Sequence, residues 1–186
     1  HLATGRIGKP GAGPFSITGQ PNAMGGREVG GLASTLAAHL GFSEAERDRA
    51  QRFWQSPTIC PGPGLKAVDM FEAMAQGRIK AVWIMATNPA VSMPDARRAR
   101  VALANCPFVV VSDCIAETDT LRFAQVKLPA LGWGEKDGTV TNSERRISRQ
   151  RAFLAPPGEA RADWWAIAEV AQRMGFAGFD YPTAAS

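Results

Sequence analysis

The spacing of apolar residues changes along the chain, from helical in the first part to short continuous runs in the middle. Helical spacing predicts one helix over about 27–40 and another over about 43–54. Ser43 and Glu46 stand three residues apart at the start of the second helix and predict a capping box. A third helix is expected over about 65–76, with one apolar stripe made of Leu65, Val68, Phe71 and Met74.

The apolar runs at 79–86 and 108–111 predict two strands buried on both faces, which is the pattern of a parallel sheet. A helix expected over 94–105 begins with Pro and completes a βαβ unit. A third short strand is expected at 126–128. A last helix is expected at about 161–174, with the side chains of Trp164, Ile167, Ala168 and Ala171 facing the protein interior. The sequence therefore predicts an α/β fold of three layers, α/β/α, around a short, mainly parallel sheet.

We expect two units along the chain. Residues 1–125 hold a Gly-rich loop and the βαβ unit, and residues 126–186 form a loop-rich segment with a C-terminal helix that packs on the first unit. The stretch from Gly5 to Gly31 holds nine Gly and three Pro among apolar and amide residues. Gly permits close backbone approach and Pro fixes φ, so this mixture predicts an ordered loop wrapped around something.

Composition narrows the class of protein. The chain has 186 residues, 45% hydrophobic and 20% charged, and a net charge of +4, which is typical of a globular protein. No apolar run approaches the roughly 20 residues of a membrane span, so we expect no membrane partner. The basic cluster at 97–100 suits a solvated helix face, and the one at 145–151 lacks helical periodicity, which leaves an anion or a partner domain as candidate contacts. Neither alternates with aromatic residues, so nucleic acid is not an expected partner.

The cysteines and histidines do not predict a metal site. Cys60, Cys106 and Cys114 lack metal-ligand spacing and are interpreted as buried structural thiols in a reducing compartment. His39 follows two alanines in a predicted helix and is expected to be a packing residue. We therefore expect no metal ligand and no Ser-His-Asp constellation in this chain.

Polar residues follow both predicted strands. Asn88 follows the first strand, and Ser112 and Asp113 follow the second, at the edge where open parallel sheets bind ligands. Lys136 lies in a predicted turn, and Asp163 lies near the start of the last helix. The same residue types also form turns and helix caps, so spacing alone leaves both interpretations open.

Several motifs together resemble the molybdopterin oxidoreductase family, and within it the catalytic subunit of bacterial nitrate reductases. The long stretch from Leu2 to Gly31 carries most of the resemblance, and its Met24–Arg27 variant resembles the assimilatory branch. Formate dehydrogenase and dimethyl sulfoxide reductase belong to the same family. Shorter landmarks agree in order at 83–89, 110–113, 128–130, 133–139, 142–146 and 163–165.

The resemblance implies a cofactor and roles for particular residues. Enzymes of this family hold molybdenum between two molybdopterin guanine dinucleotides. Gln20 matches the loop that approaches the pterin and the metal, and Arg27 matches an arginine near the substrate nitrate. A guanidinium is a planar fork of donors that suits a planar anion. The residues that match contacts to one dinucleotide are Asn88, Ser112, Asp113, Lys136 and Asp163.

The resemblance also implies a function, with departures. It implies a cytoplasmic enzyme that reduces nitrate to nitrite, with electrons from a donor protein or domain through a 4Fe-4S cluster. The cysteine motif for that cluster, the cysteine ligand of molybdenum and the C-terminal domain are missing from this sequence, and the chain begins with His. We therefore expect an internal piece of a longer enzyme, inactive alone, whose partners include the remaining domains.

Two alternatives stay open: a related enzyme that acts on formate or an N-oxide, and a non-catalytic nucleotide-binding module. The predicted helix over 27–40 places Arg27 in its first turn, where a positive charge is unfavourable. A role toward substrate is favoured there over a purely structural role.

Overall fold

The computed structural model describes residues 1–14 and 19–186. The helices are α1 (Ala23–Glu28), α2 (Glu44–Trp54), α3 (Ala67–Ala75), α4 (Pro89–Ser92), α5 (Ala96–Asn105) and α6 (Asp163–Arg173). The strands are β1 (Ala81–Met85), β2 (Phe108–Asp113), β3 (Val126–Pro129), β4 (Gly138–Thr141) and β5 (Ile147–Gln150). Short 3₁₀ turns are η1 (Ala37–His39), η2 (Thr120–Phe123) and η3 (Trp133–Glu135). Within the described ranges, no helix is long and apolar enough to cross a membrane.

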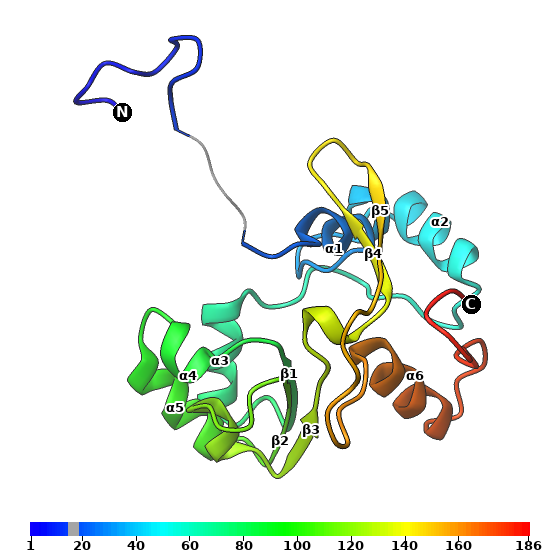
Figure 1. The fold of residues 1–186 in the computed structure, drawn as a ribbon. Coiled ribbons are helices and arrows are strands. Elements are labelled where there is room, and N and C mark those ends of the chain that lie inside the picture. Colours follow the sequence, from blue (N-terminus) through cyan, green and yellow to red (C-terminus); the bar gives the residue numbers. More distant parts are fainter. Residues whose placement is uncertain (15–18) are drawn as a thin grey trace.

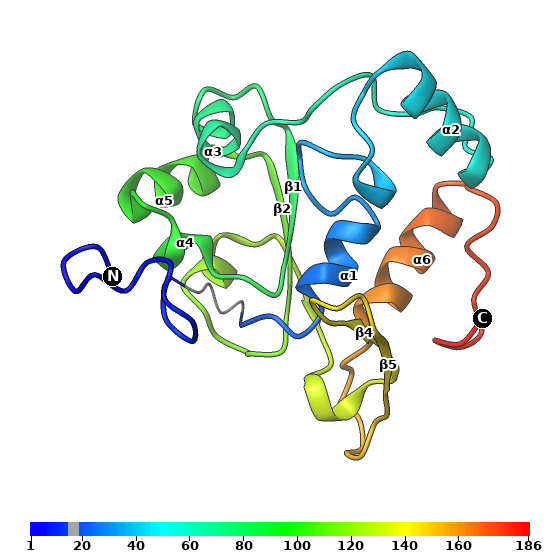
Figure 2. The same cartoon turned by 90° about the horizontal axis from the view of Figure 1, so that it is seen from above.

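The centre of the molecule is a three-stranded sheet in the order β1-β2-β3, with both pairs parallel. Figure 1 shows α3, α4 and α5 on one side of this sheet. Figure 2 shows α1, α6 and the β4–β5 hairpin on the other side. The α/β class and the parallel sheet expected from the sequence are thus confirmed.

The packed core lies between the sheet and the helices α3 and α5. Ile84 on β1 faces the same way as Val109 and Val111 on β2, because alternate residues of a strand share a face. The core consists of Phe71, Met74, Ile84, Ala90, Ala99, Ala102, Leu103, Cys106, Val109, Val111 and Leu121. Of the apolar side chains that the sequence pattern placed inside, this core contains Phe71, Met74, Ile84, Val109 and Val111.

The second face of the sheet is only half covered. Trp83, Met85 and Val110 point to this face and are half-buried. The indole Nε1 of Trp83 donates a hydrogen bond to Ser112 Oγ at 2.8 Å. The two strands expected to be buried on both faces are therefore mostly buried on the face toward α3 and α5 and half-buried on the other.

The helix predicted over 27–40 is wrong. Helix α1 begins at Ala23 and ends at Glu28, and the chain then turns at Gly30, whose φ is +81°. A Cβ on Gly30 would lie 2.8 Å from the backbone nitrogen of Ala37, so the chain folds back too tightly for a continuous helix. The two adjacent glycines, Gly30 and Gly31, explain the break, because glycine accepts a left-handed φ at little cost.

The other predicted helices are found with shifted ends. Helix α2 has the expected capping box between Ser43 and Glu46. The stripe predicted for α3 holds for Phe71 and Met74, which are buried. Two other residues predicted to face inward are exposed instead, namely Leu65 and Val68.

Corrections also arise in the last third of the chain. Ile167 of α6 is 43% exposed and does not point inward, whereas Ala168 is buried. The β4–β5 hairpin occupies a segment expected to be loop. Cys106 is buried as expected, but Cys60 and Cys114 are exposed. These thiols lie in loops after α2 and β2, where little packs over them.

The N-terminal Gly-rich segment is described in part. Residues 1–14 form short turns among themselves, such as the bond from the Arg6 N–H to the His1 carbonyl at 3.0 Å. This part of the chain extends away from the body of the molecule in Figure 1. Residues 15–18, which belong to the loop predicted to wrap around something, lie outside the described residues.

Candidate functional site

A cavity of about 510 Å³ opens at the carboxyl edge of the sheet, between the segment after β2 and the segment after β3. Asp113, the last residue of β2, lines this cavity. Its Oδ1 accepts a hydrogen bond from the Ile115 N–H at 3.0 Å, and its carbonyl accepts one from the Ala130 N–H at 3.0 Å. The carboxylate is held in place by the turn, and its Oδ2 accepts no hydrogen bond from the described residues.

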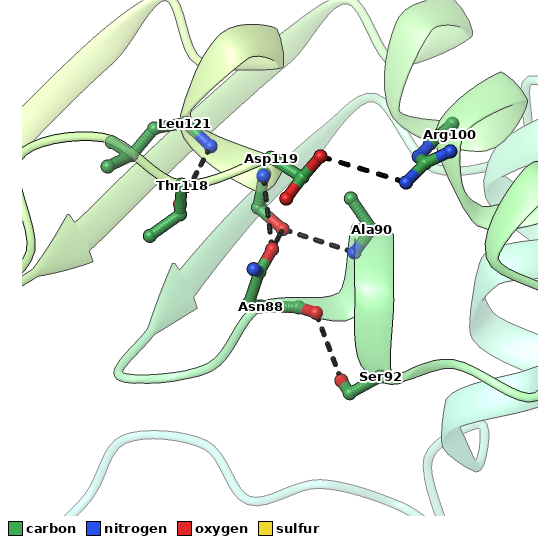
Figure 3. A network of polar contacts seen from close by, with 8 residues as sticks. Asn88, Ala90, Ser92, Arg100, Thr118, Asp119 and Leu121 are labelled. Atoms are coloured by element: carbon green, nitrogen blue, oxygen red, sulfur yellow. Dashed lines mark hydrogen bonds and ion pairs between the residues drawn. The ribbon is translucent and has the colours of Figure 1, made fainter.

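Asn88 belongs to a polar network that connects the end of β1 with η2 (Figure 3). Its Oδ1 accepts from the Thr120 N–H at 3.1 Å and from the Thr120 Oγ1 at 2.6 Å. The Thr120 hydroxyl oxygen accepts the Ala90 N–H at 3.1 Å, and Thr120 is fully buried. The fold therefore uses the acceptor of Asn88, and its side-chain N–H₂ is what remains for a ligand.

Ser112 lies on β2 with only 3% of its surface exposed. Its hydroxyl accepts the hydrogen bond from the Trp83 indole across the second face of the sheet. Because a hydroxyl can donate as well as accept, Ser112 keeps one donor, but its place is inside the sheet rather than on an open edge.

A second cavity, of about 540 Å³, lies between the segment from Gln20 to Ala23, the turn that leads into β4, and the start of α6. Lys136 Nζ and Asp163 Oδ2 form an ion pair of 3.0 Å on its wall, with about 30% of each side chain exposed. Asp163 Oδ1 is buried and accepts no hydrogen bond from the described residues. A buried carboxylate oxygen without a donor is costly, so this atom favours a ligand with an N–H or O–H group.

Arg27 lies in the last turn of α1, not in the first turn of a helix as predicted. A positive charge there complements the helix dipole, so the dipole argument for a substrate role no longer holds. The side chain is exposed and makes no hydrogen bond or ion pair with the described residues. Its guanidinium is thus available to an anion.

The structure brings some of the predicted residues together and separates others. Gln20, Lys136 and Asp163 line the second cavity, and Asp113 lines the first. Arg27, Asn88 and Ser112 are absent from the lining of both cavities. Among residues 1–14 and 19–186, no group of three or more His, Cys, Asp or Glu residues could hold a metal ion.

Other lining residues were not singled out from the sequence. Glu135 faces the first cavity while its Oε2 accepts the Gly132 N–H at 2.7 Å. The spacing of Gly132 and Glu135, three residues apart before a turn, was an available signal of a cap. Asn22 and Trp133 line the second cavity and lie far apart in sequence, so no local pattern relates them.

The donors and acceptors of the two cavities suit a large polar ligand. Asp113 and Asp163 offer carboxylate oxygens to N–H or ribose hydroxyl groups, and Lys136 offers a cation to phosphate. The unpaired Asp163 Oδ1 supports this assignment, because a nucleotide-like ligand would supply the missing donor.

A family model and two similar curated proteins assign this chain to related groups of proteins. Residues 1–173 match the molybdopterin oxidoreductase family. The nitrate reductase of Klebsiella oxytoca is 62% identical over 176 residues, which cover 95% of this chain and 20% of that protein. The nitrate reductase of Shewanella frigidimarina is 57% identical over 186 residues, or 100% of this chain and 20% of that protein. The chain thus spans about a fifth of the length of these curated relatives.

The fold is similar to that of solved structures. The acetylene hydratase from Pelobacter acetylenicus superposes with a TM-score of 0.55 and 25% identity, over 66% of this chain and 18% of that chain. The α/β arrangement described above therefore recurs in a much longer protein.

Proposed function

The chain belongs to the molybdopterin oxidoreductase family, and from this premise we propose that it forms part of a molybdenum-dependent enzyme that reduces nitrate to nitrite. The observation that carries the proposal is the 62% identity to a nitrate reductase over nearly the whole chain. The assimilatory type and a cytoplasmic location belong to the proposal, supported by the Met24–Arg27 motif.

The cofactor in this proposal is molybdopterin guanine dinucleotide with molybdenum. Lys136 and Asp163 would hold it in the second cavity with Gln20, and Asp113 would hold it at the carboxyl edge of the sheet. Asn88 and Ser112 line neither cavity, so their part in the proposal is limited to the donors that the fold leaves unused, the Asn88 side-chain N–H₂ and the Ser112 hydroxyl. When bound, the cofactor supplies the two electrons and the oxygen acceptor for nitrate reduction. The orphaned Asp163 Oδ1 and the Lys136 cation support this fit.

Nitrate in this proposal is held by Arg27. The guanidinium can donate two parallel hydrogen bonds to two oxygens of the planar anion, which fixes its orientation. The exposed position of Arg27 at the end of α1, without a protein partner among the described residues, leaves the fork free for this role.

The remaining parts of the proposal concern organisation. Residues 1–125 form one unit and residues 126–186 a second that contributes β3 to the common sheet. The rest of the polypeptide, a 4Fe-4S cluster outside this chain and an electron-donor protein or domain would complete the enzyme. On this proposal the 186 residues alone have no activity.

The test compares two variants of the full-length, molybdenum-loaded enzyme. Arg27→Ala should lower kcat/KM for nitrate about ten- to a hundredfold with unchanged molybdenum and pterin content, because a charge-assisted bond to the anion is lost. Arg27→Lys should fall between wild type and Arg27→Ala, since it keeps the charge without the fork. Asp163→Asn should instead lower pterin content.

The outcomes separate the parts of the proposal. Wild-type kcat/KM in Arg27→Ala would remove Arg27 from the substrate site. Full pterin content in Asp163→Asn would remove Asp163 from the cofactor site. Wild-type enzyme that turns over formate or an N-oxide but not nitrate would replace the proposed substrate by one of these.

A further inference from the structure

Helix α1 is attached to the β4–β5 hairpin at both of its ends. At the start of the helix, Asn22 Oδ1 accepts a hydrogen bond from the Thr141 N–H at 2.9 Å. At its end, Glu28 meets Arg145, with Nε 3.0 Å from Oε1 and Nη2 donating to Oε2 at 3.1 Å. The two segments are more than a hundred residues apart in sequence, so these contacts are tertiary.

Hydrogen bonds within the hairpin turn fix the backbone at Arg145. Asn142 Oδ1 accepts from the N–H groups of Glu144 and Arg146, both at 3.0 Å. The Arg145 N–H donates to the Asn142 carbonyl at 3.0 Å, and Arg145 itself has a φ of +60°. Non-glycine residues rarely adopt this conformation, so the Asn142 bonds stabilise a turn that the Arg145 backbone alone disfavours.

Glu28 is the fixed partner in this contact. Its side chain is 21% exposed, whereas that of Arg145 is 70% exposed. His39 Nε2 also lies 3.3 Å from Glu28 Oε1. Oε1 accepts no well-directed hydrogen bond from the described residues, so charge rather than hydrogen-bond geometry holds it. A half-buried carboxylate that contacts the Arg145 guanidinium on one side and the His39 imidazole on the other fixes the end of α1 more firmly than a fully exposed pair would.

Polar contacts matter here because α1 has no buried residue. A helix of 6 residues without an apolar anchor is not stable by itself, so its orientation depends on these contacts. Arg27 occupies the same turn as Glu28. Any rotation of that turn about the helix axis moves the Arg27 guanidinium.

We propose that Arg145 and Glu28 are positioning residues that hold the Arg27 guanidinium in its orientation toward nitrate. This inference rests on the proposed role of Arg27. Neither residue touches the substrate. Their ion pair restricts the last turn of α1 before the anion arrives, so less conformational freedom is lost when nitrate binds.

The test uses the full-length, molybdenum-loaded enzyme with the substitution Arg145→Ala. The KM for nitrate should rise roughly three- to tenfold, while kcat should change less than about twofold. This effect is smaller than the roughly hundredfold loss of rate that a displacement of about 1 Å at a reacting group can cause, because Arg27 is loosened rather than moved. Molybdenum content should stay the same. Hydrogen exchange at the amides of residues 26–31 should become faster, which reports on α1 without relying on activity.

Arg146→Ala is the matched control. Arg146 is the next residue of the same turn, is exposed, and has no side-chain partner among the described residues. Its variant removes the same charge and should keep the wild-type KM. Either single charge reversal, Glu28→Arg or Arg145→Glu, should raise the KM for nitrate. The double reversal, which restores an ion pair, should bring the KM back most of the way to the wild-type value.

A double variant separates this inference from the proposed function. If Arg145 acts through Arg27, then Arg145→Ala should have almost no further effect on kcat/KM in an Arg27→Ala background. An undiminished effect in that background, or a loss of molybdenum in Arg145→Ala, would overturn the positioning role. Wild-type kinetics in Arg27→Ala alone would instead contradict the proposed role of Arg27 in the substrate site, on which this inference rests.

Discussion

The sheet with α3 and α5 and the region of α1 with the β4–β5 hairpin are stabilised by different forces. The first region encloses a core that includes Met74, Leu103 and Val109, all essentially excluded from water. The second contributes no residue to that core. Its elements are joined by side-chain bonds such as Asn22 to Thr141 and Glu28 to Arg145. Apolar burial therefore fixes the scaffold, and polar contacts fix the part that carries Arg27.

The largest effect is expected for Leu103→Ala in the core of the first region. Leu103 is 1% exposed, and its truncation should lower the free energy of unfolding by about 2–5 kcal/mol through lost burial and the cavity left behind. Val101→Ala on the same helix is the control, because Val101 is 50% exposed and should change stability by no more than about 0.5 kcal/mol. Urea denaturation of the chain measures both. Equal losses in the two variants would contradict the view that this face of α5 holds the core.

The same difference explains how much of the fold was predictable. Strands β1 and β2 carry short apolar runs. A parallel strand covered on both faces needs apolar side chains at successive positions, so such a run predicts the strand from the sequence alone. The β4–β5 hairpin has no such signal, since most residues of β5 are exposed. Its strands are stabilised by contacts with α1 that only the folded chain creates, so local pattern could not predict it.

The candidate site shows the same limit. Residue type and place after a strand predicted Asp113, which lines a cavity at that edge. The ion pair of Lys136 with Asp163 joins residues 27 positions apart, and nothing in the local sequence of either predicts the other. The position of Arg27 in α1 was wrongly predicted because the tight turn at Gly30 depends on the approach of Ala37, a tertiary contact.

A smaller effect is expected where α1 meets the hairpin. A Cβ on Gly25 would lie 2.0 Å from Asn22 Oδ1, so Gly25→Ala should displace that side chain and remove its bond to the Thr141 N–H. The loss is about 1 kcal/mol, and exchange of the Thr141 amide should become roughly fivefold faster. The core should remain intact, because the displaced side chain can move into solvent.

Gly26→Ala provides the matched control for this variant. A Cβ on Gly26 would meet no atom within 4 Å, so the substitution should stabilise the helix by about 0.5–1 kcal/mol. Hydrogen exchange followed by NMR measures both variants. A Thr141 amide protected equally in the two would show that the Asn22 bond does not hold the hairpin.

The smallest effect is expected at the start of α2, where another exposed polar contact fixes a helix end. The Ser43 hydroxyl, with the backbone N–H groups of Gly41 and Ser43, donates hydrogen bonds to Glu46 and lowers its pKa below the ordinary 4.5. The folded state then binds fewer protons than the unfolded state at acidic pH. The stabilisation is complete above pH 4.5 and is lost as pH falls through the lowered pKa.

Glu46→Gln should remove this pH dependence, whereas Glu44→Gln, which removes a charge from the same turn without those bonds, should keep it. Amide exchange in α2 followed from neutral to acidic pH measures the difference, and an unchanged pH profile in Glu46→Gln would show that the capping box does not couple protonation to the helix end.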